Sequence, residues 1–151
     1  MVMSSNIVNA VNCRIMVARA TSLVLTDISG ETNTADITFA NTLETARVFG
    51  GGGYPWRSGG FKDVTVAFTI YYSTALNEGL ELLRTWWLTY PDQVRNIQID
   101  VPDDAVGSDR YTLPCKLSDF KVTLNAGTSA PIQCTGTFML AGTPTVGTIA
   151  T

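Results

Sequence analysis

The sequence predicts a mainly β fold, an antiparallel β-sandwich or partial barrel with one flanking α-helix. Three observations lead to this prediction. Several short runs alternate between apolar and polar residues and are separated by turn residues, which is typical of antiparallel sheets. A single run with helical periodicity, about Thr74–Tyr90, interrupts them. One long segment, about Asn41–Gly60, has no periodicity and is predicted to be a loop.

The clearest pattern is a strand followed directly by a helix. Residues 64–72 alternate between apolar and polar side chains, which predicts a half-buried strand. Ser73 or Thr74 could then cap a helix that Pro91 would end. Trp86 is expected at the rim of the core or in a subunit contact. The residues at helical spacing, which are predicted to pack against the core, are Leu76, Leu80, Leu83 and Trp87.

Shorter alternating runs predict the remaining strands. Two or three strands precede the long loop, and the others follow the helix. This organisation places one domain over residues 11–141, flanked by an N-terminal arm, 1–10, and a C-terminal arm, 142–151. The predicted strand ranges are 11–19, 22–28, 34–39, 94–101, 110–116, 117–125 and 131–141.

The predicted loop combines glycines with large apolar side chains. Gly50–Gly53 allow almost any backbone path. Aromatic side chains on such a loop are costly to expose, so we expect them to contact a partner surface; the alternative is that they fold back onto the same domain. The residues expected to make this contact are Phe49, Tyr54, Pro55, Trp56 and Arg57.

Composition narrows the possible functions. Only 15% of the residues are charged, against roughly a quarter in an average soluble protein, so part of the surface is expected to be covered by a partner. The net charge of −3 argues against a protein that grips nucleic acid through basic clusters. The first ten residues carry no basic side chain, and no apolar run is long enough to span a bilayer. We therefore expect neither a signal peptide nor a membrane segment.

The sequence offers little for catalysis. It contains no histidine, which removes the commonest general base and metal ligand. The three cysteines lack metal-ligand spacing and are expected to be reduced core residues: Cys13, Cys115 and Cys134. Four acids share one loop region, but they match no calcium loop and no pair suggests a glycosidase: Asp100, Asp103, Asp104 and Asp109. No catalytic residue, metal or cofactor is expected, and the protein is expected not to be an enzyme.

The order of these features resembles the major tail tube proteins of tailed bacteriophages, whose fold is shared with contractile injection machines. The resemblance extends from about Val11 to Pro144, and its most specific parts are Trp56–Asp63 and Leu117–Phe120. It implies a β-sandwich with a flanking helix, six subunits to a ring, and rings stacked into a hollow tube. The long loop would reach a neighbouring ring, and the termini would act as further arms.

The resemblance also implies the surroundings of the protein. Its partners would be copies of itself, a tape measure protein and DNA in the lumen, terminator and baseplate proteins at the tube ends, and a sheath in a contractile tail. It would be a virion protein, assembled in the host cytoplasm. Acids on polar strand faces would repel passing DNA, and the candidates are Asp63, Asp100 and Asp119. The alternative function is a virion decoration or receptor-binding module that uses the same aromatic, glycine-rich loop.

Overall fold

The computed structural model describes residues 13–20, 24–46, 52, 55–75, 78–102 and 106–150, with the backbone alone for Trp56. This part of the chain forms a mainly β structure with one helix, as predicted. The elements are β1 (Arg14–Ala18), β2 (Leu25–Asp27), β3 (Thr32–Ala46), β4 (Trp56–Tyr71), α1 (Gly79–Thr89), β5 (Arg95–Val101), β6 (Asp109–Thr123), β7 (Gln133–Leu140) and β8 (Thr145–Thr148).

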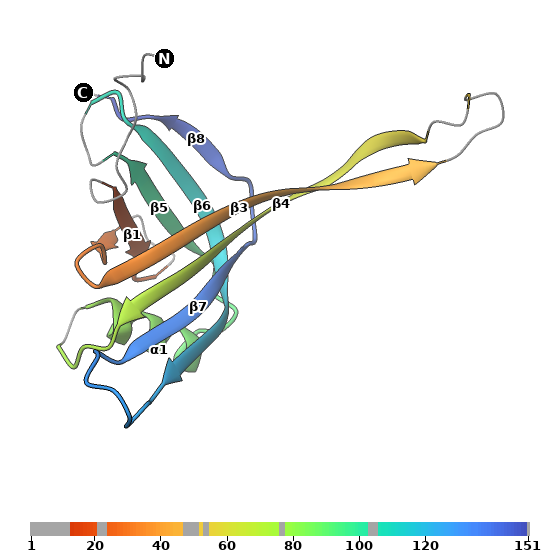
Figure 1. Cartoon of the computed structure of the whole chain (residues 1–151). Coiled ribbons are helices and arrows are strands. Elements are labelled where there is room, and N and C mark those ends of the chain that lie inside the picture. Colours follow the sequence, from red (N-terminus) through yellow and green to blue (C-terminus); the bar gives the residue numbers. More distant parts are fainter. Residues whose placement is uncertain are drawn as a thin grey trace, which may run out of the picture.

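The strands form one antiparallel sheet in the order β2-β1-β5-β6-β7-β4-β3, with β8 added to β6. The long strand β6 joins two halves of this sheet. Its first half pairs with β5 and β8, its second half pairs with β7, and the register shifts between Leu117 and Asp119. Such a shift bends a strand. The sheet folds over far enough to bring Phe39 of β3 within 5.9 Å of Tyr111 of β6, measured between ring centroids, which makes a partial barrel (Figure 1).

The core lies between α1 and the curved sheet. In Figure 1 the helix lies behind β7 and β4, and it packs its apolar face against them. Phe138 is at the centre, with its ring centroid 4.4 Å from Phe68 and 5.8 Å from Trp86. Gly136 leaves room for this arrangement, because a Cβ atom there would lie 2.6 Å from the Phe68 ring. The aromatic stack therefore depends on a glycine in the middle of β7.

The helix is shorter than predicted, and its predicted cap is wrong. It begins at Gly79, with Glu78 in the N-cap position and without a side-chain cap. The Gly79 amide instead donates a 2.8 Å hydrogen bond to Oε2 of Glu31, which comes from the turn before β3. Ser73 accepts a hydrogen bond from Ala75, ahead of the helix. A distant carboxylate thus replaces the local cap that the sequence suggested.

The two adjacent tryptophans exchange the predicted roles. Trp86 is fully buried, whereas 53% of Trp87 is exposed, so the prediction that Trp87 packs in the core is wrong. Leu80 and Leu83 are buried, which confirms these two packing residues. The remaining member, Leu76, lies outside the residues that the structure describes. With a helix that begins at Gly79, the inward face contains Trp86 rather than its neighbour.

The long predicted loop is wrong for most of its length. Residues 41–46 continue β3 and residues 56–60 continue β4, and the two segments pair up to Ala46 with Trp56. Both faces of these segments are exposed, so no alternation of apolar and polar residues marks them as strands. The predicted C-terminal arm is extended, but Thr145–Thr148 pairs with β6 of its own chain.

The cysteines are free thiols. Cys115 and Cys134 are buried, as predicted, and Cys13 is partly exposed. Burial raises the pKa of Cys115 to about 12, with a further contribution from the charge of Asp63. A thiol with this pKa stays protonated and unreactive, so it serves as a small apolar core residue.

Candidate assembly surfaces

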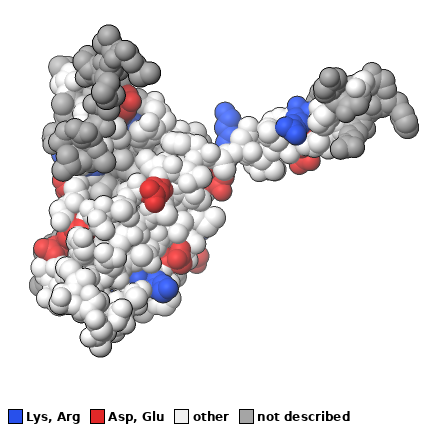
Figure 2. Space-filling view, in the orientation of Figure 1, with Lys and Arg blue, Asp and Glu red and all other residues white. Residues whose placement is uncertain are grey.

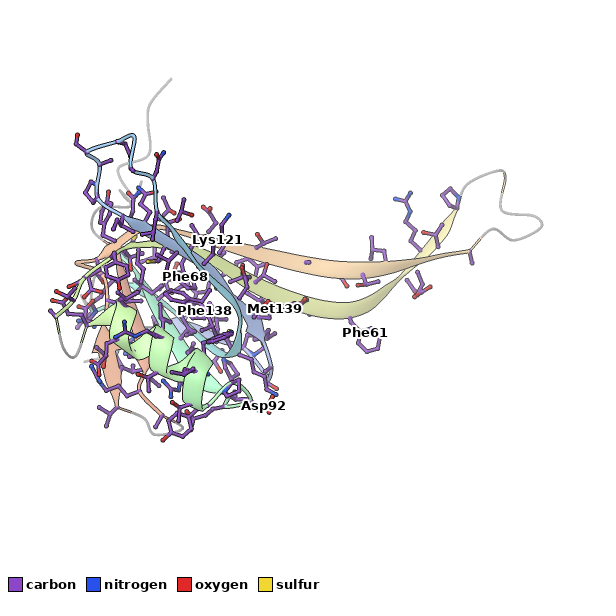
Figure 3. The ribbon with its side chains drawn as sticks, turned by 90° about the horizontal axis from the view of Figure 1, so that it is seen from below. Phe61, Phe68, Asp92, Lys121, Phe138 and Met139 are labelled. Atoms are coloured by element: carbon purple, nitrogen blue, oxygen red, sulfur yellow. The ribbon has the colours of Figure 1, made fainter. Side chains whose placement is uncertain are left out.

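The most prominent surface is a two-stranded arm, formed by residues 41–46 of β3 and 56–62 of β4. The arm leaves the body of the domain and projects well beyond it (Figure 1). Its apolar side chains are exposed: Leu43 by 52% and Phe61 by 87%. Figure 3 shows Phe61 on the arm, pointing away from the ribbon. Exposed apolar groups on a projecting element indicate a partner surface.

The arm starts at a bulge. Asn41 pairs with Lys62, but Leu43 pairs with Gly59, so the register shifts across Thr42. A Cβ atom on Gly60 would overlap the backbone carbonyl of Thr42. This close approach requires glycine, and it sets the point where the two strands leave the sheet.

Three of the five residues predicted to make a ring-to-ring contact are described, and they lie at the outer end of the arm. Pro55 and Arg57 are exposed there, and Arg57 pairs with Thr45 across the two strands. Trp56 begins β4. Phe49 and Tyr54 lie outside the described residues. The contact itself stays a prediction, but its described members lie on the projecting arm rather than on a loop folded against the body.

The main path of the sheet ends in β2 and β3, and β8, which within the described residues pairs with β6 alone, adds a further short edge. The edge strand β3 has 15 residues and pairs on one side with β4. Along its other side, no strand from the described part of the chain pairs with it. A long edge strand of this kind presents unpaired N–H and C=O groups and is a template for another strand.

The second broad surface is the side of β3, β4, β7 and β6 that faces away from α1, which we call the open face. Its uncharged residues are mostly threonines, its charges are spread over the face, and it is mostly white in Figure 2. A shallow depression of about 240 Å³ lies on it. Three rows of paired residues cross it: Thr34, Thr69, Thr135 and Lys121; Asp36, Ala67, Thr137 and Asp119; Thr38, Thr65, Met139 and Lys116.

The predicted lumen acids do not share one environment. Asp63 and Asp119 are both exposed. Asp119 belongs to the central row of the open face, whereas Asp63 pairs with Ala40 in the row that follows Thr38 and Thr65. Whether they line a lumen stays a prediction. Asp36 is a third exposed acid of this face, which sequence reasoning missed. Its pairing with Ala67, in the same row as Asp119, is visible only once the strand register is known.

Asp100 is wrong as a lumen acid, because its side chain has no exposure even in a single chain. Its Oδ1 accepts a 2.7 Å hydrogen bond from Nε of Arg110, and its Oδ2 accepts one of 3.1 Å from Arg14. Burial alone raises the pKa of Asp100, but the hydrogen bonds and charges of the two arginines outweigh it, so the pKa lies below its ordinary value. Asp100 is a structural ion-pair centre between β1, β5 and β6.

The described residues contain no metal-binding cluster and no membrane-spanning helix. Within them, no three His, Cys, Asp or Glu side chains gather closely enough to hold a metal ion. Among the same residues α1 is the one helix, and it is neither long enough nor apolar enough to cross a bilayer.

Comparison with known proteins identifies the fold. No protein-family model and no curated protein matches this sequence. Among solved structures, a chain from the tail of an empty gene transfer agent particle with C6 symmetry superimposes with a TM-score of 0.74 at 14% identity, over 92% of this chain and 98% of that one. The SPP1 tail tube gives 0.72 at 7% identity, over 95% and 81%.

A third similar structure comes from a contractile machine. A chain of the sheath-tube complex of an extracellular contractile injection system has a TM-score of 0.61 at 12% identity, over 96% of this chain and 94% of that one. Identities this low establish the architecture and leave the function to be argued from the surfaces. The curved sheet, the flanking helix and the projecting arm together make this chain a protein with the tail tube fold.

Proposed function

We propose that this protein is the subunit of a tail tube, in which six copies close into a ring and the rings stack into a hollow conduit for DNA. The observation that carries the proposal is the pair of surfaces left incomplete in one chain: the edge of β3 along the body, residues 32–40, and the apolar arm. Both are hazards in a monomer and are completed by further copies. The C6 symmetry of the similar gene transfer agent tail supports six subunits per ring.

Ring closure would use the sheet edges. On its outer side β3 pairs with no strand in the described part of the chain, and β2 is at the other end of the same sheet. Addition of a strand to an exposed edge is a general mode of protein association. Because the two edges differ, each subunit can bind a neighbour on both sides, and the rotation between neighbours closes the ring.

The open face would line the lumen, and α1 would lie outside. The uncharged side chains of this face, mostly threonine, offer no strong binding group to a passing polymer, and three acids repel phosphates: Asp36, Asp63 and Asp119. Lys116 and Lys121 lie in rows on either side of the central acidic row, so the positive charge is dispersed. This distribution favours sliding of DNA over adhesion.

The other partners follow from the same proposal. DNA and a tape measure protein would occupy the lumen, terminator and baseplate proteins would bind the tube ends, and a sheath would surround the tube in a contractile tail. The protein would be located in the virion tail after assembly in the host cytoplasm.

The first test is electron microscopy of the purified protein over a range of concentrations. We expect hollow tubes above a critical concentration and rings or monomers below it. A protein that stays monomeric at millimolar concentration, or that forms only trimers, would overturn the proposal and favour a decoration or receptor-binding module.

The second test concerns the lumen. The double variant Asp36→Lys, Asp119→Lys should still form tubes but should retain DNA that co-sediments at low salt and is released at high salt. Asp92→Lys is the matched control, since Figure 3 places Asp92 on the helix side, away from Lys121 of the open face. If the control and the double variant retain equal amounts of DNA, the proposal that the open face lines the lumen is wrong.

A further inference from the structure

We propose that the arm docks on a second copy at the opposite end of the same strands. This docking surface, which we call the far end, consists of Tyr72, Val122, Leu124 and Ile132. The inference rests on the proposed tube function and adds to it the receptor for the arm.

The far end is an apolar continuation of the core face. The amide of Tyr72 donates a 2.8 Å hydrogen bond to the carbonyl of Ile132, and Val122 pairs with Cys134 of β7 one step closer to the core. These side chains belong to the ends of β4, β7 and β6, beyond the part of the core that α1 covers. Leu124 is 74% exposed, and the other three are each exposed by 38–39%. A groove of about 280 Å³ at the β6–β7 turn shares Ile132 with this surface, but its other strand residues, Thr123, Gln133 and Thr135, belong to the open face.

A second copy fits this surface for a geometric reason. The arm extends from the opposite ends of β3 and β4 and points away from the body, so it cannot reach the far end of its own chain (Figure 1). Displacing a copy along the strands brings the arm of one molecule to the far end of the next. Contact between two different surfaces of the same chain repeats without closing, which generates a stack.

More cations than acids lie on the arm, and two acids lie near the far end, where Lys121 also precedes Val122 in β6. Arg57 and Lys62 lie on the arm, together with one acid, Glu44. Two acids lie beside the far end: the carbonyl of Glu31 accepts a hydrogen bond from Tyr71, and its carboxylate reaches Gly79, the residue after Glu78. Burial raises the pKa of Glu31. A cation brought there by a second copy would favour the ionised carboxylate.

A competing receptor lies at the base of the arm. It is a groove of about 500 Å³ between the β3–β4 pair and the β7–β8 connection, lined in part by Phe39, Val64 and Val146. This groove is at the same end of the sheet as the arm. When a second copy is displaced along the strands, its arm does not reach this groove. The far end is therefore the docking site that we propose for the arm.

Single substitutions test the assignment. Leu124→Asp at the far end and Phe61→Asp on the arm should each raise the critical concentration for tube growth by about tenfold or more, because each places a charge where an apolar contact is required. Leu88→Asp on α1 is the matched control, since Leu88 is 69% exposed and belongs to neither surface. It should change the critical concentration by less than about twofold. Circular dichroism of the dissociated variants checks that each one folds.

Mixing the two assembly variants gives the decisive result. The arm of the Leu124→Asp protein is intact, and so is the far end of the Phe61→Asp protein, so a 1:1 mixture should form paired rings but no long tubes. Likewise, Glu78→Arg should partly rescue Arg57→Glu. If wild-type protein forms tubes and Leu124→Asp assembles like the Leu88→Asp control, the far end is not the receptor and the tube proposal stands. If wild-type protein forms no tubes, both fail.

Discussion

Replacing Trp86 by alanine should destabilise the fold far more than the same change at its neighbour, Trp87. Trp86 is fully buried, its ring stacks on Phe138, and its indole N–H donates a 2.9 Å hydrogen bond to the carbonyl of Gln93. The guanidinium carbon of Arg95 lies 5.0 Å from the ring centroid. The variant removes all three interactions at once and leaves a cavity.

The magnitude follows from these contacts. Truncating a buried Trp to Ala costs about 3–5 kcal/mol through lost burial and the cavity. The Gln93 carbonyl, which loses its donor, and the Arg95 cation, which loses the ring, together add about 1 kcal/mol. The expected loss of about 4–6 kcal/mol is a large part of the 5–15 kcal/mol that is typical of total domain stability. Trp87 is 53% exposed, so its replacement should cost about 1 kcal/mol or less.

Urea denaturation of dissociated protein, followed by far-ultraviolet circular dichroism, measures the difference. With a denaturant slope of about 2 kcal/mol per molar urea, Trp86→Ala should lower the midpoint by about 2–3 M and Trp87→Ala by about 0.5 M or less. Trp86→Phe keeps a ring for stacking and should fall between them. Equal midpoints for the two alanine variants would falsify the assignment of Trp86 as the core tryptophan of α1.

Two further predictions concern the arm and the buried ion pair. Gly60→Ala should clash with the Thr42 carbonyl and loosen the arm, so that limited proteolysis cuts it about tenfold faster while the urea midpoint stays nearly unchanged; an unaltered cleavage rate would contradict the role of the bulge. For Asp100, whose folded-state pKa is lowered, the stabilisation is present above the unfolded value of about 3.9 and is lost as the pH falls through the folded-state pKa. Asp100→Asn should therefore cost about 2–4 kcal/mol at pH 7 and make unfolding below pH 4 less steep; an acid transition identical to that of the wild type would show that another carboxylate dominates it.

The sequence predicted the sheet where one face of a strand is buried and failed where both faces are exposed. The alternation at residues 64–72 identified the inner part of β4 because Val66, Phe68 and Ile70 enter the core. The outer part of β4 and the end of β3 bury neither face, so their strand pairing left no periodic signal. The arm therefore looked like a loop.

The helix shows a second limit. Its apolar residues occur on more than one face, so spacing alone allowed either Trp86 or Trp87 to point inward. The choice depends on where the helix begins, and that is set by Glu31, 48 positions away from the Gly79 amide that it binds. A local search for a cap could not find it.

The sequence by itself determined what depends on near neighbours: a β-rich chain, a single amphipathic helix and an apolar core. It also showed that the chain has no histidine and few charged residues, which led us to expect a partner on part of its surface. Tertiary structure decided what depends on strand register. Asp100 became a buried ion-pair centre because pairing places Arg14 and Arg110 opposite it, 86 and 10 positions away along the chain. Asp36 and Asp119 came into one row for the same reason. Long-range pairing brings such residues together, and no local pattern in the chain encodes it.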